Sequence, residues 1–247
     1  MIVTPIKTNK ILPFKYELFE ILDHYVTNMK EKSILAITSK IVSLCEGRVV
    51  KIGTVDKQAL IKKESELYLP YENPYHITLT IKQGILIPTA GIDESNGYGY
   101  YILWPKDAQK TANEVKEYLQ KRFALTHVGV IIVDSKTTPL RWGTTGIAIA
   151  HSGFAALNDY IGKPDIFGRK LNVTKANIMD SLGATAVAVM GEGNEQTPLT
   201  TIEDAAFVRF TRKNPTEEEI DALKIERKDD LYAPLLTCPQ WKKGEDA

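Results

Sequence analysis

The chain has 247 residues, 43% of them hydrophobic and 25% charged, which are ordinary proportions for a globular protein. Lys plus Arg and Asp plus Glu number 31 each, so no basic excess indicates a nucleic acid or an anionic membrane as a partner. Apolar runs are shorter than a membrane span, and Cys45 and Cys238 have no neighbours at metal-ligand spacing, so we expect a cytoplasmic protein without a disulfide framework.

The N-terminal region is predicted to alternate between strand and helix. Ile2–Ile6 fits a short strand, and Lys15–Lys32 fits an amphipathic helix because apolar residues recur at helical spacing, namely Leu18, Ile21, Leu22, Tyr25, Val26 and Met29. The apolar strand Ser33–Thr38 then runs into Ser39, Lys40 and a helical turn. This order is typical of phosphate-binding corners, although the glycines of a Walker loop are missing and most such corners are only structural.

The next region is predicted to contain a helix and a β-hairpin. The helix covers Asp56–Leu69 and has a charged outer face. The hairpin strands, His76–Ile81 and Ile85–Pro88, flank a turn at Gln83-Gly84.

Carboxylates follow two of the predicted β segments. Asp93 comes after the hairpin in the string AGIDESN, and a further strand is expected over Tyr100–Trp104. After a helix at Asp107–Phe123, the apolar run Val128–Val133 predicts a buried strand that ends at Asp134. A carboxylate there is costly unless it is paired or binds a cation, and the alternative is that it merely caps a turn.

A turn-rich surface loop is expected at Asp159–Leu171. A helix is expected over Thr174–Met190, and a strand at Thr185–Met190 is the alternative. A third acid, Glu192, follows this element. Glu192 stands between two glycines in MGEGNEQTP, a pattern that lacks the third glycine of a dinucleotide-binding loop. The glycines fit either a backbone close to a metal or phosphate, or a plain helix-ending turn.

The C-terminal region is predicted to hold little regular structure. Phe207–Phe210 fits a last strand, and Thr216–Leu223 fits a short helix with a capping box made by Thr216 and Glu219. From Trp241 the tail is polar and is expected to fray.

The three acids Asp93, Asp134 and Glu192 each follow an ordered apolar segment and lie in a loop rich in Gly, Ser or Thr. If they converge, their oxygens suit Mg²⁺ or Mn²⁺, with the Ser135 hydroxyl as a further ligand, and such ions usually also take phosphate oxygens. This would indicate nucleotide phosphate chemistry. The alternative is three unrelated turn acids, because sequence spacing cannot establish convergence.

Between about residue 2 and about residue 200, the sequence resembles the coenzyme F420-0:L-glutamate ligase family. The motifs that carry the resemblance occur in the family's order and are Ser39-Lys40 with CEGRVV, AGIDESN, VGVIIVDS, GIAIAHSG, DYIGKPDIFGRKL and VMGEGNE. The resemblance implies an α+β fold of mixed sheets with flanking helices and an intertwined homodimer. It assigns residues 1–200 to the ligase-like domain, which would consist of either one lobe or two. Residues 201–247 would be an extension packed on the same unit, with a polar tail.

The resemblance also implies the reaction. L-Glutamate would be joined by an amide bond to a carboxylate of the deazaflavin F420-0 through an acyl phosphate, with GTP as co-substrate, two Mg²⁺ or Mn²⁺ ions and K⁺ as a further candidate ion. Carried over by motif, the metal ligands are Asp93, Asp134, Ser135 and Glu192. The nucleotide-binding candidates are Thr8, Asn9, Lys10, Ile11, Ser39, Lys40, Asn96, Gly191, Glu192, Gly193, Asn194 and Glu195. Asp134 and Arg141 are the catalytic candidates, and Lys40, Arg141 or Arg169 could clamp a phosphate or carboxylate, although each of these cations is more often a surface charge.

The chain departs from the family pattern in two places. Leu44 stands where family members commonly carry a lysine, and Lys136–Trp142 replaces a segment with more basic residues. Trp142 suggests a flatter or more apolar acceptor surface, so a folate-type acceptor is an alternative. A phosphotransferase using the same metal site, or a metal- or nucleotide-binding regulator without turnover, is also left open.

Overall fold

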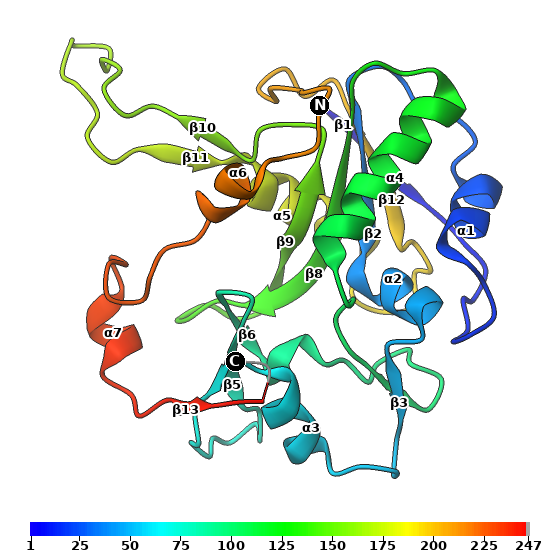
Figure 1. The fold of residues 1–247 in the computed structure, drawn as a ribbon, viewed down its shortest axis with the longest axis vertical. Coiled ribbons are helices and arrows are strands. Elements are labelled where there is room, and N and C mark those ends of the chain that lie inside the picture. The colour runs from blue at the N-terminus through cyan, green and yellow to red at the C-terminus, as the bar shows by residue number, and fades with distance from the viewer. Residues whose placement is uncertain (246–247) are drawn as a thin grey trace.

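The computed structural model describes residues 1–245, which form an α+β fold built on a central five-stranded sheet of order β1-β12-β2-β8-β9 (Figure 1). Only β2 and β8 run parallel, and the other neighbours are antiparallel. The strands are β1 (Ile2–Ile6), β2 (Ser33–Thr38), β8 (Val128–Thr137), β9 (Thr144–Ser152) and β12 (Leu199–Glu203). The predicted strands at Ile2–Ile6 and Ser33–Thr38 are confirmed.

Helices cover both faces of this sheet. Because successive strand residues point to opposite faces, Val130 and Ile132 pack with one cluster and Ile131 and Val133 with another. The first cluster is covered by α1 (Leu18–Tyr25), α2 (Ser39–Glu46) and α4 (Ala108–Phe123), and the second by α5 (Ile178–Met190). Burial on both faces explains why β2 and β8 are continuous apolar runs.

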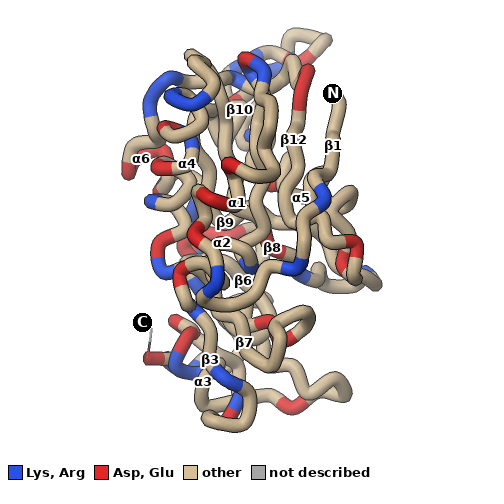
Figure 2. The backbone as a smooth tube through the Cα atoms, turned by 90° about the vertical axis from the view of Figure 1, so that its right-hand side faces the viewer, with Lys and Arg blue, Asp and Glu red and all other residues tan. Residues whose placement is uncertain are grey.

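A smaller unit lies beside one end of the central sheet (Figures 1 and 2). In the described part of the chain it contains a four-stranded sheet of order β13-β4-β5-β6 and a separate pair of β3 with β7. Its elements are β3 (Val49–Lys51), α3 (Lys57–Glu64), β4 (Leu67–Tyr68), β5 (Leu79–Lys82), β6 (Ile85–Pro88), the 3-10 turn η1 (Thr89–Gly91), β7 (Tyr100–Ile102) and β13 (Lys242–Lys243). The Gln83-Gly84 turn is confirmed, and both residues have the positive φ that a tight hairpin needs.

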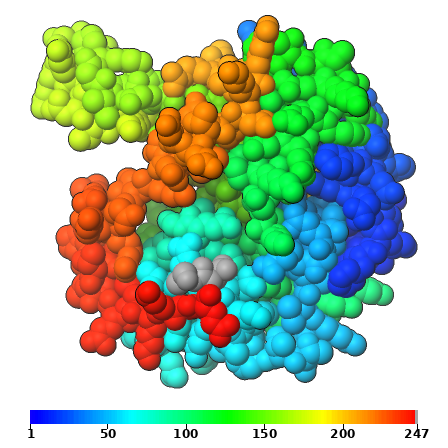
Figure 3. Space-filling view, in the orientation of Figure 1, coloured from blue at the N-terminus to red at the C-terminus, as the bar shows by residue number. Residues whose placement is uncertain are grey.

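An arm projects from the body, formed by β10 (Leu157–Asp159), β11 (Lys175–Asn177) and the residues between them (Figures 1 and 3). Its connecting segment includes the predicted surface loop Asp159–Leu171. Apolar side chains are exposed on it, with Ile166 91% and Phe167 89% accessible. Two short helices, α6 (Glu217–Asp221) and α7 (Ala233–Thr237), lie in the C-terminal segment, and α6 has the predicted capping box of Thr216 and Glu219.

Two predicted helices are shorter in the structure. The helix expected over Lys15–Lys32 ends at Tyr25, although Val26 and Met29 are still buried, so apolar spacing continues beyond the helical backbone. The helix expected over Asp56–Leu69 ends at Glu64, because Ser65 is extended and Leu67–Tyr68 pairs with β5 as a strand.

Two other boundaries and one predicted strand were also wrong. The strand that begins at Val128 does not stop before Asp134 but continues to Thr137, paired with β9. The helix before Glu192 begins at Ile178, after the Asn177 cap, and its course to Met190 excludes a strand there. Phe207–Phe210 is not a strand, since only Phe210 makes an isolated bridge, with Phe154.

The fraying expected from Trp241 is wrong for the described part of the tail. Lys242 and Lys243 pair with β4, and the Gly244 N–H donates to Glu66 O at 2.9 Å, because the edge of β4 offers free backbone groups. Asp246 and Ala247 lie outside the described residues. No helix formed by residues 1–245 is both long and apolar enough to cross a bilayer.

His151 is expected to make stability dependent on acid pH. It is 2% exposed, and its Nδ1 has no hydrogen-bond partner within residues 1–245. Burial lowers its pKa from 6.5 to about 4, against the opposing charge of Glu219. The unfolded chain therefore binds the proton more readily, and stability present above pH 6.5 should fall by about 3 kcal/mol as the pH drops towards 4.

Urea unfolding at about pH 7.5 and about pH 4.5 measures this contribution. His151→Gln should lose less stability between the two pH values than the wild type, and the exposed His24→Gln variant should behave like the wild type. An equal loss in all three proteins would contradict the assignment.

Candidate functional site

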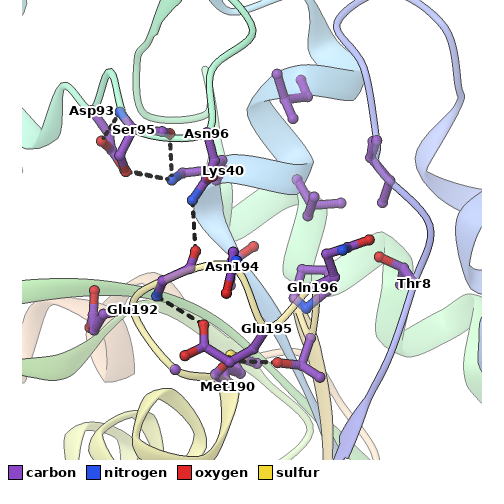
Figure 4. Close-up of a pocket in the computed structure, with 18 of the residues that line it drawn as sticks. Thr8, Lys40, Asp93, Ser95, Asn96, Met190, Glu192, Asn194, Glu195 and Gln196 are labelled. Atoms are coloured by element: carbon purple, nitrogen blue, oxygen red, sulfur yellow. Dashed lines mark hydrogen bonds and ion pairs between the residues drawn. The ribbon is translucent and has the colours of Figure 1, made fainter.

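A cavity of about 560 Å³ opens at the end of the central sheet (Figure 4). Five segments wall it: the loop after β1, the junction of β2 with α2, the loop after η1, the middle of β8 and the loop between α5 and β12. All the predicted metal and nucleotide residues line this cavity, namely Thr8, Asn9, Lys10, Ile11, Ser39, Lys40, Asp93, Asn96, Asp134, Ser135, Gly191, Glu192, Gly193, Asn194 and Glu195.

Lys40, from the first turn of α2, reaches across the cavity to the loop after η1 (Figure 4). Its Nζ lies 2.6 Å from Asp93 Oδ2 and donates to Ser95 O at 3.0 Å. Asp93 also accepts from the backbone N–H and the hydroxyl of Ser95. Burial alone would raise the pKa of Asp93, but Lys40 and these donors outweigh it, so the pKa is lowered and the carboxylate stays charged.

The pKa of Asp134 is shifted in the opposite direction to that of Asp93. Its Oδ2 accepts from the indole N–H of Trp104, and its Oδ1 accepts from the Ser135 N–H at 2.8 Å. Burial raises its pKa to about 6, helped by the negative charge of Asp93, while the two hydrogen bonds and Lys40 oppose the rise. A charge that is costly at neutral pH would be stabilised by a cation bound in the cavity.

Ser135 contacts a different part of the cavity from Asp134. The two residues are neighbours in a strand and therefore point to opposite faces. The Ser135 hydroxyl donates to Glu192 Oε2 at 3.2 Å, after the end of α5. Of the four predicted ligands, Ser135 and Glu192 are in contact, and the charge of Asp93 acts on Asp134.

The loop after α5 is closed by its own side chains. Glu195 accepts from the Gly193 N–H at 2.9 Å, and the Asn96 amide donates to Gly193 O at 2.8 Å, which ties this loop to the Asp93 loop. A Cβ at Gly191 would lie 2.4 Å from Glu195 Cδ, and Gly191 has a φ of +79°, so this turn requires glycine.

The loop after β1 lies against the same region. Its Thr8 N–H donates to Gln196 O at 2.8 Å, and the Asn9 N–H donates to the Tyr25 hydroxyl at 3.0 Å. Leu44, where the chain departs from the pattern that the resemblance implies, is 3% exposed and places an apolar side chain in the cavity wall.

The oxygen donors suit a hard divalent cation in kind, since three carboxylates and a hydroxyl line one cavity. Across residues 1–245, however, no three His, Cys, Asp or Glu side chains gather as a group that could hold a metal. The ammonium of Lys40, 2.6 Å from Asp93 Oδ2, neutralises one of these carboxylates.

Arg141, a predicted catalytic residue, is not among the residues that line the cavity, and it is exposed at the turn between β8 and β9. Arg169 lies on the exposed arm. Trp104 was not predicted as a site residue. Its position at the end of a predicted strand was a signal, because a tryptophan buried there normally needs a partner for its N–H, which here is Asp134.

Comparisons with known proteins agree with the predicted resemblance. Residues 6–204 match the model of a family described as F420-0:Gamma-glutamyl ligase. A protein of Methanococcus maripaludis strain C7, named Coenzyme F420:L-glutamate ligase, is 35% identical over 206 residues, which are 77% of this chain and 82% of that protein. Proteins of the same name from M. maripaludis strain S2 and Methanopyrus kandleri are 34% and 31% identical, covering 85% and 69% of this chain and 89% and 74% of their own lengths. The chain therefore belongs to the F420-0:Gamma-glutamyl ligase family.

Proposed function

We propose that the protein joins L-glutamate to a carboxylate of an F420-0-type acceptor through an acyl phosphate, with GTP as phosphoryl donor. The family membership supports the ligase activity, and its relatives' name indicates glutamate and an F420-type acceptor as substrates. The observation that carries the assignment to a site is the cavity in which Lys40, Asp93, Asp134 and Glu192 meet from separate segments.

The nucleotide would lie along the junction of β2 and α2. The Thr38 side chain makes no capping hydrogen bond, so backbone N–H groups of the first turn of α2 can receive a phosphate. Lys40 would offset the phosphate charge after leaving Asp93, and Asn96 with Gly191–Glu195 would contact the nucleotide from the facing loops.

The acids would hold divalent metal, Mg²⁺ or Mn²⁺, which would neutralise charge on the transferred phosphate. Asp93 and Asp134 would provide one pair of oxygens, and Ser135 and Glu192 the other. Two pairs on either side of a strand are consistent with two ions. K⁺ stays a further candidate.

The reaction would take place in two displacements. An acceptor carboxylate oxygen attacks the γ-phosphorus, forming an O–P bond as the bond to GDP breaks. The glutamate amine then attacks the acyl carbon, forming the C–N bond as phosphate leaves and the amine loses a proton. The residues of this chain would align the reactants and exclude water, which is the larger part of catalysis in phosphoryl transfer.

The relatives favour the deazaflavin acceptor over the folate-type alternative, and they favour a ligase over a regulator without turnover. The segment Lys136–Trp142, which begins two residues after Asp134, is where this chain departs from the family pattern that the resemblance implies. A cytoplasmic location is supported by the free thiols of Cys45 and Cys238.

The proposed homodimer is supported by the projecting arm, whose apolar residues Ile166, Phe167 and Val173 are at least 85% exposed in the single chain (Figure 3). We expect light scattering to give the mass of two chains. Phe167→Asp should shift the population towards monomer, whereas Lys163→Asp, on the same arm, should do so less. A monomeric wild type would contradict the homodimer.

Ligation can be tested directly. Purified protein is incubated with Mg²⁺ or Mn²⁺, GTP or ATP, glutamate, and either F420-0 or a reduced folate, and the products are weighed by mass spectrometry. A gain of one glutamyl unit on F420-0 that requires GTP and metal is expected. Nucleotide hydrolysis that no acceptor changes would contradict the ligase assignment.

A further inference from the structure

Trp104 lies between the two segments that carry Asp93 and Asp134. It follows β7 and is 1% exposed. Its indole N–H donates to Asp134 Oδ2, on β8. The same nitrogen end of the indole lies against Gly91, two residues before Asp93, where an added Cβ would lie 2.1 Å from Trp104 Nε1.

The turn before Asp93 has an unusual backbone. Thr89, Ala90 and Gly91 are consecutive and have φ values of 54°, 53° and 71°, a region that L residues other than glycine seldom adopt. Such a turn persists only where its surroundings hold it. The Ala90 N–H donates to Thr80 Oγ1 at 2.8 Å, and the indole occupies the space beside Gly91.

Asp93 is attached to the same strand by its backbone. Its N–H donates to Ile102 O at 2.9 Å, and the Ile102 N–H donates to Asp93 O at 2.7 Å. Ile102 is two residues before Trp104. A displacement of Trp104 would therefore be transmitted to Asp93 through both the strand and the packed turn.

The Asp134 carboxylate is oriented by the same tryptophan. One of its oxygens accepts from the Ser135 N–H, and the other accepts from the indole. Two donors on the two oxygens fix the plane of the carboxylate and leave further lone pairs for a cation or a substrate donor.

We propose that Trp104 is a positioning residue that sets the arrangement of Asp93 and Asp134, by its indole N–H to Asp134 and by its ring against the Gly91 turn. The backbone of Trp104 is itself fixed, since Arg48 Nε donates to Trp104 O at 3.2 Å. The inference rests on the proposed function for the use of the two acids, and on the hydrogen bond and packing for the role of the tryptophan.

Trp104→Phe tests the N–H, because it keeps an aromatic ring and removes the donor. The control is Trp241→Phe, which removes an indole N–H that donates to Leu236 O at 2.8 Å in the C-terminal segment. We expect the dissociation constant for Mn²⁺, measured without nucleotide, to rise about 10–100-fold in Trp104→Phe, with a similar loss in kcat, and to be unchanged in Trp241→Phe. A merely structural role would lower the thermal midpoint and leave Mn²⁺ affinity at the wild-type value, which would overturn the proposal.

A second measurement does not depend on the proposed function. In ¹H–¹⁵N spectra, the Trp104 indole resonance is the one that disappears in Trp104→Phe. It should move in Asp134→Ala and stay in place in Asp229→Asn, which alters an exposed carboxylate. If the wild type neither binds Mn²⁺ nor ligates glutamate, the proposed function fails. The response of this resonance to Asp134→Ala then tests the positioning role of Trp104 on its own. An indole resonance whose chemical shift is unchanged in Asp134→Ala would overturn the inference.

Discussion

Asp134→Asn is expected to lower glutamate ligation by about 10³-fold while the protein stays folded. The substitution keeps the shape of the side chain and removes the charge that the proposed metal and phosphate chemistry requires. The measurement is kcat and kcat/KM for glutamyl transfer, with Asp229→Asn as a control that changes an exposed aspartate. Activity at the wild-type level in Asp134→Asn would contradict the role of Asp134.

The same variant should keep about the stability of the wild type at neutral pH. Because burial raises the pKa of Asp134 to about 6, the folded state holds its proton more tightly than the unfolded state does. This contribution to stability is complete below about pH 4 and is lost as the pH rises through 6. Removing the charge abolishes that loss, while the amide keeps only one of the two acceptor oxygens, so the two effects oppose each other and the thermal midpoint at about pH 7.5 should stay close to that of the wild type. Loss of activity without loss of stability would separate a functional role from a structural one.

The apolar strands could be predicted from local pattern, whereas most of the cavity-lining residues were predicted from the resemblance to a known family. The runs at β2 and β8 are buried on both faces, so their composition alone identifies them. The ends of elements could not be predicted as well. Asp134 was expected to end its strand, but pairing of Lys136 and Thr137 with Thr145 and Thr144 extends β8, and this cross-strand pairing is invisible in one segment.

The strand extension also decides how the acids are arranged. With Asp134 and Ser135 in a loop, both could turn to one ion, whereas in a strand they face opposite sides. Likewise, Lys40 beside Asp93 and Trp104 beside Asp134 join residues that lie far apart in the sequence. The residue types of the site followed from motifs, but their pairing depended on the tertiary structure.

Glu64→Ala should lower the free energy of unfolding by about 3 kcal/mol. Glu64 is 8% exposed, and its Oε2 lies 2.7 Å from Arg48 Nη2 and 2.8 Å from Lys82 Nζ. Lys82 is 3% exposed and keeps its contact with the backbone carbonyl of residue 64 in the variant. Removing the carboxylate therefore takes an anionic partner from the buried Lys82 and from Arg48, whose side chain is 33% exposed.

Urea unfolding measures the effect, and Asp221→Ala is the matched control. Asp221 pairs with Lys224 at 2.8 Å, but both side chains are more than half exposed, so this pair should contribute less than about 1 kcal/mol. A loss in Glu64→Ala no larger than in the control would show that the buried cluster does not stabilise the fold.

The Glu64 cluster also bears on the site, because Arg48 holds Trp104 O and Trp104 holds Asp134. If this chain of contacts positions the carboxylate, Glu64→Ala should lower kcat at temperatures where the variant is fully folded, and by less than Trp104→Phe does. If instead the smaller unit only adds stability, kcat of the folded variant would equal that of the wild type. Comparing kcat well below the thermal midpoint therefore distinguishes coupling through Arg48 from simple loss of folded protein.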